Sequence, residues 1–189
     1  MSAQVVREIA AAAFADAIDM LAIIETLEAG NTPDAVAAAR STRTDQVVKC
    51  VYRALWSRLV VIVTRAYANA RPGDRHAQEA FDLLKDPVVR TELEAMGSDL
   101  CALDEAVALW TKCRGDYRRQ SIHDFRDKQV AHWGIQNRPS PVINDIFAVT
   151  RATATALERL AQGVGVVTLS VDSQLVDYRD AADRFWVMR

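Results

Sequence analysis

The fold is decided by the stretch D-P-V-V-R-T-E-L-E-A-M-G-S-D-L-C-A-L-D-E-A-V-A-L-W, residues 86–110. Its large apolar residues recur at alternating spacings of four and three, the repeat of one face of an α-helix. They are Val89, Leu93, Met96, Leu100, Leu103, Val107 and Trp110. Asp86 and Pro87 supply an N-cap and a first-turn proline. We therefore expect one long helix with a single apolar seam, in which Gly97-Ser98 allows a kink.

The same periodicity predicts helices elsewhere in the chain. A first helix over 5–29 ends at Gly30-Asn31, and Thr42-Arg-Thr-Asp45 resembles a capping box that opens a second helix. The second helix is apolar on more than one side, so we expect it to be central. Ser140-Pro141 precedes another helix, which Gly163-Val-Gly165 ends, and the tail begins with a β-like run from Val166.

These patterns predict an all-α protein. Residues 1–163 are expected to form a bundle of five or six helices. Residues 164–189 are expected to be an appended C-terminal segment that ends in an amphipathic helix and packs on the bundle. The 189 residues, of which 50% are hydrophobic and 25% charged, are enough for one domain with a real core.

The cysteines and the apolar runs bear on localisation. The chain has 3 cysteines, an odd number, and no pair has C-x-x-C spacing. Each lies in a helical pattern, so we expect small buried side chains in a reducing compartment. Asp16 and Asp19 interrupt the first apolar run, and no run reaches the ~18 residues that span a membrane. We therefore expect a cytoplasmic protein that does not enter a membrane.

Charge is unevenly distributed along the chain. The formal net charge is −2, which gives no general attraction to nucleic acid. Residues 111–138 nevertheless contain seven basic and three acidic residues, so this segment carries +4 and the rest of the chain −6. A basic patch on an acidic body is typical of a site for a phosphate-bearing ligand. A solvated helix face would show the same charge, and charge alone leaves both interpretations open.

The basic segment contains F-R-D-K-Q-V-A-H-W, residues 125–133. The planar guanidinium of Arg126 suits phosphate oxygens, and the imidazole of His132 can transfer a proton near neutral pH. Together they are a minimal set for cleaving a phosphodiester without a metal. In an ideal α-helix the two residues are separated by about 9 Å of rise and about 240° of rotation. They converge only where the helix frays, or where two copies of the chain pool their groups.

The run R-D-K-Q-V-A-H, residues 126–132, resembles the signature of the HEPN superfamily (higher eukaryotes and prokaryotes nucleotide-binding domains). That signature is an arginine, a polar residue, and a histidine after four to six intervening positions; here five residues intervene. The whole stretch 125–133 is similar to the abortive-infection branch of the superfamily. The expected helix order over about residues 5–162 also fits, but only the motif is specific.

The resemblance implies an all-α bundle that forms a symmetric homodimer with the motif at the interface. Many members are metal-independent endoribonucleases of toxin–antitoxin, abortive-infection and other defence systems. Carried over to this chain, Arg126 would bind the phosphate, His132 would be the acid/base, and Asp127 would orient the site. The implied partners are a second copy, an RNA substrate, and an antitoxin or another defence protein. No cofactor is implied.

Helix spacing adds three substrate-binding candidates, Arg119, His123 and Lys128. Arg119 and His123 precede Arg126 by seven and three residues. His123 and Asp127 also share a face at i, i+4 spacing, but no third ligand stands at a suitable spacing, so we expect no metal site. A short R-x(5)-H pattern also arises by chance. The alternative hypothesis is a non-catalytic HEPN-like module that dimerises or binds a nucleotide or a protein.

Overall fold

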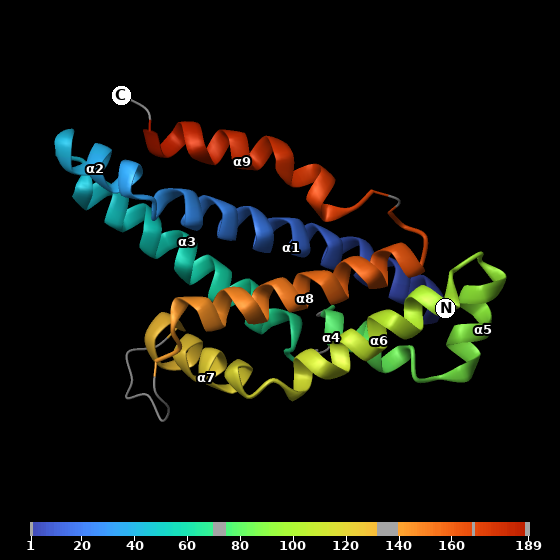
Figure 1. Cartoon of the computed structure of the whole chain (residues 1–189). Helices are drawn as coiled ribbons and strands as arrows, with labels where there is room; N and C mark the ends of the chain where they lie inside the picture. Colours follow the sequence, from blue (N-terminus) through green and yellow to red (C-terminus); the bar gives the residue numbers. More distant parts are fainter. Residues whose placement is uncertain (1, 70–74, 132–139, 168, 188–189) are drawn as a thin grey trace.

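The computed structural model describes residues 2–69, 75–131, 140–167 and 169–187, and the regular structure in these residues is helical throughout (Figure 1). The helices are α1 (Ser2–Gly30), α2 (Pro33–Ser41), α3 (Asp45–Ala66), α4 (Ala77–Leu83), α5 (Pro87–Ala95), α6 (Leu100–Gly115), α7 (Tyr117–Phe125), α8 (Ile143–Gly163) and α9 (Val171–Val187). A π-helical segment, η1 (Arg126–Ala131), continues α7. The predicted all-α class is confirmed. Nine α-helices in the described residues exceed the five or six expected.

Helix α1 is the centre of the molecule. It packs against α8, α9, α3 and α4, and Figure 1 shows α9 and α8 along opposite sides of it. Large side chains such as Met20, Ile24 and Leu27 are fully buried, and so are several alanines, which let neighbouring helices approach closely. The expectation that the second predicted helix is central was wrong. The corresponding helix α3 has buried residues only in its second half, from Leu59 to Ala66.

The long helix expected over residues 86–110 is two helices, α5 and α6. Gly97 has φ +84°, a left-handed conformation that favours glycine, and the Ser98 N–H donates to the Leu93 carbonyl at 3.0 Å. Asp99 then caps α6 by accepting two first-turn N–H groups at 2.9 and 3.1 Å. The Asp99 N–H donates to the Gly163 carbonyl at 2.8 Å and so ties the start of α6 to the end of α8. Local stop and start signals therefore override a continuous apolar seam.

Two expected helix starts were misplaced. Thr42 closes the unexpected helix α2, since its hydroxyl donates to the Ala38 carbonyl at 2.9 Å, and Thr44 gives α3 no side-chain cap. Helix α8 begins at Ile143 after Val142, later than Ser140-Pro141 predicted. The capping box failed because the threonines satisfy the carbonyls of the preceding helix instead of the N–H groups of the next.

Two further expectations were corrected. The described residues of the tail contain no strand, so its β-like start is irregular chain leading into α9. Cys113 is buried as expected, whereas Cys50 and Cys101 are exposed. Among the described residues, no helix is both long enough and apolar enough to cross a bilayer.

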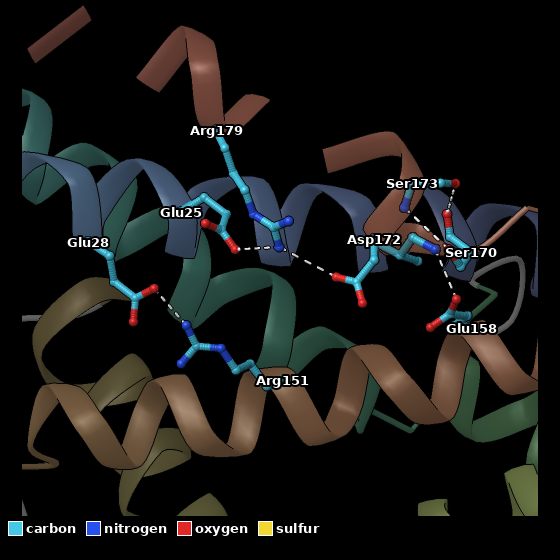
Figure 2. A network of polar contacts seen from close by, with 9 residues as sticks. Glu25, Glu28, Arg151, Glu158, Ser170, Asp172, Ser173 and Arg179 are labelled. Atoms are coloured by element: carbon cyan, nitrogen blue, oxygen red, sulfur yellow. Dashed lines mark hydrogen bonds and ion pairs between the residues drawn. The ribbon is translucent and has the colours of Figure 1, made fainter. Parts of the chain in front are cut away.

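Polar contacts join α9 and α8 to α1 and to each other (Figure 2). Arg179 of α9 reaches Glu25 of α1 at 3.1 Å, and Arg151 of α8 reaches Glu28 of α1 at 2.7 Å. Glu158 of α8 accepts the first N–H of α9, that of Val171, at 2.9 Å. Because exposed ion pairs contribute little, about 0–1 kcal/mol each, these contacts set the register of the helices more than the stability.

The far end of α9 is held by Trp186. Its indole Nε1 donates to the Thr26 carbonyl at 2.7 Å, and the ring lies against Gly30 at the end of α1. A Cβ added to Gly30 would lie 2.6 Å from Trp186 Cε2, closer than side chains tolerate. Glycine is therefore required here for the approach of the tryptophan ring.

Gly30→Ala is expected to lower the free energy of unfolding by about 1–3 kcal/mol, because the added methyl group forces the buried indole to move. Gly115→Ala is the matched control: it also lies at the end of a helix and has open space around its Cβ. The control should be neutral or stabilising by up to ~1 kcal/mol. Urea unfolding of the three proteins measures both. Equal effects of the two substitutions would contradict the packing role of Gly30.

Candidate functional site

The helix that carries the motif is fixed at its start by Asp116. This carboxylate caps α7 by accepting the Arg118 N–H at 2.9 Å, and it pairs with the Arg118 guanidinium at 2.7 Å. Hydrogen bonding from Arg118 lowers the pKa of Asp116, which therefore stays charged over a wide pH range. Arg118 also lies 3.8 Å from Asp145 of α8. The carboxylates of Asp116 and Asp145 thus neutralise the charge of Arg118, and the contact with Asp145 connects α7 to α8.

A column of stacked side chains positions the next residue, Arg119. The rings of Phe81 and Trp110 are parallel with centroids 4.4 Å apart, and Trp110 stacks on Tyr67 at 4.5 Å. The guanidinium carbon of Arg119 lies 5.1 Å from the centroid of the Tyr67 ring. Trp110, the last residue of the apolar seam that the sequence predicted, is buried as the middle of this column. The column fixes α7 relative to α3, α4 and α6.

Tyr67 in this column and Cys113 next to it are structural groups. Thr153 donates its hydroxyl hydrogen to the Val149 carbonyl at 2.7 Å, so the 2.6 Å contact between the two hydroxyls requires Tyr67 to be the donor. Burial raises the pKa of the Tyr67 phenol and also that of the Cys113 thiol. Both shifts favour the protonated forms, which disfavours a thiolate nucleophile at Cys113.

The motif itself begins where α7 becomes the π-helix η1. Asp127 lies between two basic side chains: its Oδ1 is 3.0 Å from Arg126 Nε and its Oδ2 is 3.2 Å from His123 Nδ1. The three side chains are 32% (Arg126), 38% (Asp127) and 44% (His123) exposed, so each is partly accessible to solvent. We call Arg126, Asp127 and His123 the motif cluster. π-Helical turns are rare and occur frequently at functional sites.

Arg119 and Arg126 each have a buried N–H donor without a hydrogen-bond acceptor among the described residues. Nε of Arg126 and Nε of Arg119 are buried and make no hydrogen bond with the described residues. For Arg126 the carboxylate of Asp127 is near enough, at 3.0 Å, so the direction of the N–H prevents the bond. An unsatisfied buried donor costs about 1–3 kcal/mol, and such groups in native proteins commonly have a functional reason.

The predicted site residues are therefore only partly brought together. Arg126, Asp127 and His123 form the motif cluster, whereas Arg119 lies over the Tyr67 ring. Lys128 is half-buried and forms no ion pair with the described residues. His132 and Trp133 lie outside the described residues. The approach of Arg126 to His132, and the catalytic and substrate-binding roles, thus stay predictions.

Sequence reasoning did not identify the residues that support this helix. Gly115-Asp116 carried a usable signal, because a glycine followed by aspartate is a common helix stop and start. Nothing in the sequence indicated that Tyr67 and Phe81, from two other helices, would join Trp110 and Arg119 in one column. Such contacts depend on tertiary packing between distant segments.

A metal site would require several ligand side chains grouped close together. In residues 2–69, 75–131, 140–167 and 169–187, no three His, Cys, Asp or Glu side chains are grouped so as to hold a metal ion.

A cavity of about 430 Å³ lies between the end of α1, α2 and α3, and none of its lining residues belongs to α7 or η1. Its apolar wall includes Val36, Val48 and Tyr52, and its basic residues are Arg40, Lys49 and Arg53. It is a second candidate binding site.

The ion pair at the start of α7 gives a pH-dependent prediction. Because the folded-state pKa of Asp116 lies below its unfolded value, its stabilisation is present above about pH 4 and is lost as pH falls through the folded pKa. Asp116→Asn keeps a capping oxygen but removes the charge. The variant should unfold more easily than wild type at pH 7, and the difference should shrink as pH falls below 4. Urea unfolding across pH 2–7 measures it. A difference that is constant with pH would contradict the ion pair's contribution.

The chain was compared with protein-family models, with curated proteins and with solved structures, and none of the three comparisons finds a match. The resemblance to the HEPN superfamily therefore rests on the motif and on the all-α architecture alone. Functional assignment has to proceed from the geometry of the motif cluster and of the cavity.

Proposed function

We propose that this protein is a metal-independent endoribonuclease of the HEPN type, acting in phage defence or as a toxin. Arg126 and His132 would form its active site at a homodimer interface. The observation that carries the proposal is the motif cluster: the motif arginine and its polar neighbour are paired with each other in a π-helical turn and partly open to solvent. Asp127, next to Arg126, would take the orienting role that the motif implies.

Local charge also supports an RNA substrate. Arg118 is neutralised by Asp116 and Asp145, which reduces the positive charge available from α7. Lys112 and Arg114, in the last turn of α6, are exposed and form no ion pair with the described residues. These two cations, together with Lys128 and the motif arginine, would attract a polyanion.

In the proposed reaction the ribose 2′-hydroxyl attacks the adjacent phosphorus and the bond to the 5′-oxygen breaks. Arg126 would stabilise the charge that accumulates on the phosphate oxygens, and His132 would transfer protons. The products would be a 2′,3′-cyclic phosphate and a 5′-hydroxyl. No step requires a metal ion.

The first test is cleavage of total RNA by purified protein in EDTA. Wild type should cut and leave 2′,3′-cyclic phosphate ends. Arg126→Ala and His132→Ala should each lower the rate about 10²–10⁴-fold, the usual contribution of an acid/base or charge-stabilising group. The matched control is Gln120→Ala, an exposed position on α7 outside the motif, which should cut like wild type. Cleavage that disappears with EDTA, or that survives both motif substitutions, would contradict the proposal.

The second candidate function is non-catalytic nucleotide binding, and the cavity between α2 and α3 favours it. Its volume lies in the range of small-molecule sites, and an apolar wall beside three basic residues suits a base joined to phosphates. Lys49 is paired with Asp45 at 3.2 Å, whereas Arg40 and Arg53 form no ion pair with the described residues. These two arginines would hold the phosphates.

If the cavity binds a nucleotide, ATP should raise the melting temperature of the wild-type protein. At a concentration of 100 times Kd the stabilisation would be about 2.7 kcal/mol. Arg53→Ala should remove most of this shift. Arg184→Ala, an exposed arginine on α9 away from the cavity, should keep it. Differential scanning fluorimetry with ATP and with adenosine separates phosphate recognition from base recognition. An absence of any shift with wild type would reject this candidate.

A further inference from the structure

We propose that the cavity between α2 and α3 is a second RNA-binding site, in which one unpaired base enters the cavity and the phosphates on either side of it bind arginines. This inference rests on the proposed ribonuclease function, because that function makes RNA the polyanion to be bound. Its ligand is a continuous strand, whereas the second candidate function takes a free nucleotide. The cavity has no lining residue from α7 or η1, so the site is separate from the motif cluster.

The segment that forms this site is the second basic region of the chain. Residues 33–58 contain five basic and two acidic side chains, a net charge of +3, although the whole chain carries −2. Two of the five are each paired with an aspartate, Lys49 at 3.2 Å and Arg58 at 3.5 Å. The three exposed arginines that form no ion pair in the described part of the chain are Arg40, Arg43 and Arg53. Such unneutralised guanidinium groups attract a polyanion.

Two of these arginines lie at the cavity itself. Arg40 of α2 and Arg53 of α3 line it beside its apolar wall, and the volume of about 430 Å³ is enough for a nucleobase. The hydroxyl of Tyr52 donates to the Leu27 carbonyl at 2.5 Å, so the polar end of this side chain is already bonded within the bundle. The wall therefore offers apolar and aromatic surface, which accepts a base of any sequence, while the guanidinium groups suit phosphate oxygens.

Arg43 extends the site from a nucleotide to a strand. It lies between α2 and α3, three residues after Arg40, and it is not a lining residue of the cavity. Its φ of +57° places it in a left-handed conformation at the end of α2, where the Thr44 N–H donates to the Ala39 carbonyl at 3.0 Å. Glycine is the preferred residue at this position of a helix end. An exposed, unpaired arginine held there at a conformational cost is explained by a phosphate bound outside the cavity.

Helix α3 connects this site to the motif. Its first half lines the cavity, and the helix also packs against α7 and η1. Figure 1 shows α2 and α7 apart, with α3 running between them. A strand bound at the cavity would raise the local concentration of RNA around the motif, so the two sites together would bind RNA more tightly than either one alone.

The test is the binding of a fluorescently labelled single-stranded RNA of about 12 nucleotides whose 2′-hydroxyls are methylated. This probe cannot be cleaved, because the attacking hydroxyl is blocked, so binding is measured separately from the reaction. Fluorescence anisotropy at several salt concentrations gives Kd and its salt dependence. The proteins are wild type, Arg53→Ala, Arg43→Gly and the control Arg184→Ala. Arg184 is an exposed arginine of α9 that lies 3.7 Å from Asp180 and does not line the cavity.

Arg53→Ala and Arg43→Gly should each weaken binding about tenfold and lower the slope of log K against log salt by about 0.7, the share of one phosphate contact. Arg43→Gly should also raise the melting temperature, because glycine fits the left-handed conformation, so its weaker binding cannot be a loss of fold. Arg184→Ala should bind like wild type, and ATP should bind at least about tenfold more weakly than the probe, because it lacks the flanking phosphate.

Wild-type affinity in both Arg53→Ala and Arg43→Gly would overturn the inference. ATP binding as tight as that of the probe, with no effect of Arg43→Gly, would also overturn it, because the cavity would then take a free nucleotide. Neither result touches the ribonuclease proposal, which is tested by cleavage of unmodified RNA. A wild-type protein that binds the probe through these arginines but cuts no RNA would remove the proposed function and support the binding site.

Discussion

The structure depends on the burial of α1 against several neighbours at once. A helix with buried residues on several sides cannot be stable alone in water, and its alanines allow α8, α3 and α9 to pack closely around it. Helix α8 is in turn buried along much of its length, and its last residue, Gly163, admits the Leu103 side chain of α6 at a distance that no Cβ would permit. The α1–α8 pair is therefore the base on which the other helices, including the one with the motif, are placed.

The position of the candidate site follows from that base through a short series of contacts. Thr153 on α8 accepts a hydrogen bond from the Tyr67 hydroxyl. The Tyr67 ring stacks on Trp110, and the Arg119 guanidinium lies over the same ring. Helix α7 has a single buried residue, Ile122, so apolar burial contributes little to its placement. The ion pair at Asp116 and the stacked column fix its direction instead. The motif cluster thus lies at the end of a helix that is held by polar and aromatic contacts at its beginning.

The sequence predicted what depends on local pattern and missed what depends on packing between distant segments. Apolar periodicity identified the helical class, the long first helix and the position of α8, because burial of a helix face requires that spacing. It failed at residues 96–99, where a glycine at positive φ and an aspartate cap outweigh a continuous seam. It also made α3 central, since periodicity shows that a face is apolar but not which partner covers it. At the site, the i, i+4 spacing placed His123 and Asp127 on one face, where they lie 3.2 Å apart, whereas the π-helix of η1 has no simple sequence signal.

The arrangement of the motif cluster bears on whether this is merely a solvated helix face. On a solvated face each arginine donor would be hydrated, and no energetic cost would arise. Here Nε of Arg126 is buried and makes no hydrogen bond within the described part of the chain, although a carboxylate lies 3.0 Å away. The helix also leaves α-geometry at this same residue. Two unfavourable features at the first residue of the motif, on a helix with little apolar burial, are difficult to explain by stability alone. Because the Arg126 side chain is still 32% exposed, an incoming phosphate group would have to be met by guanidinium nitrogens other than the buried Nε.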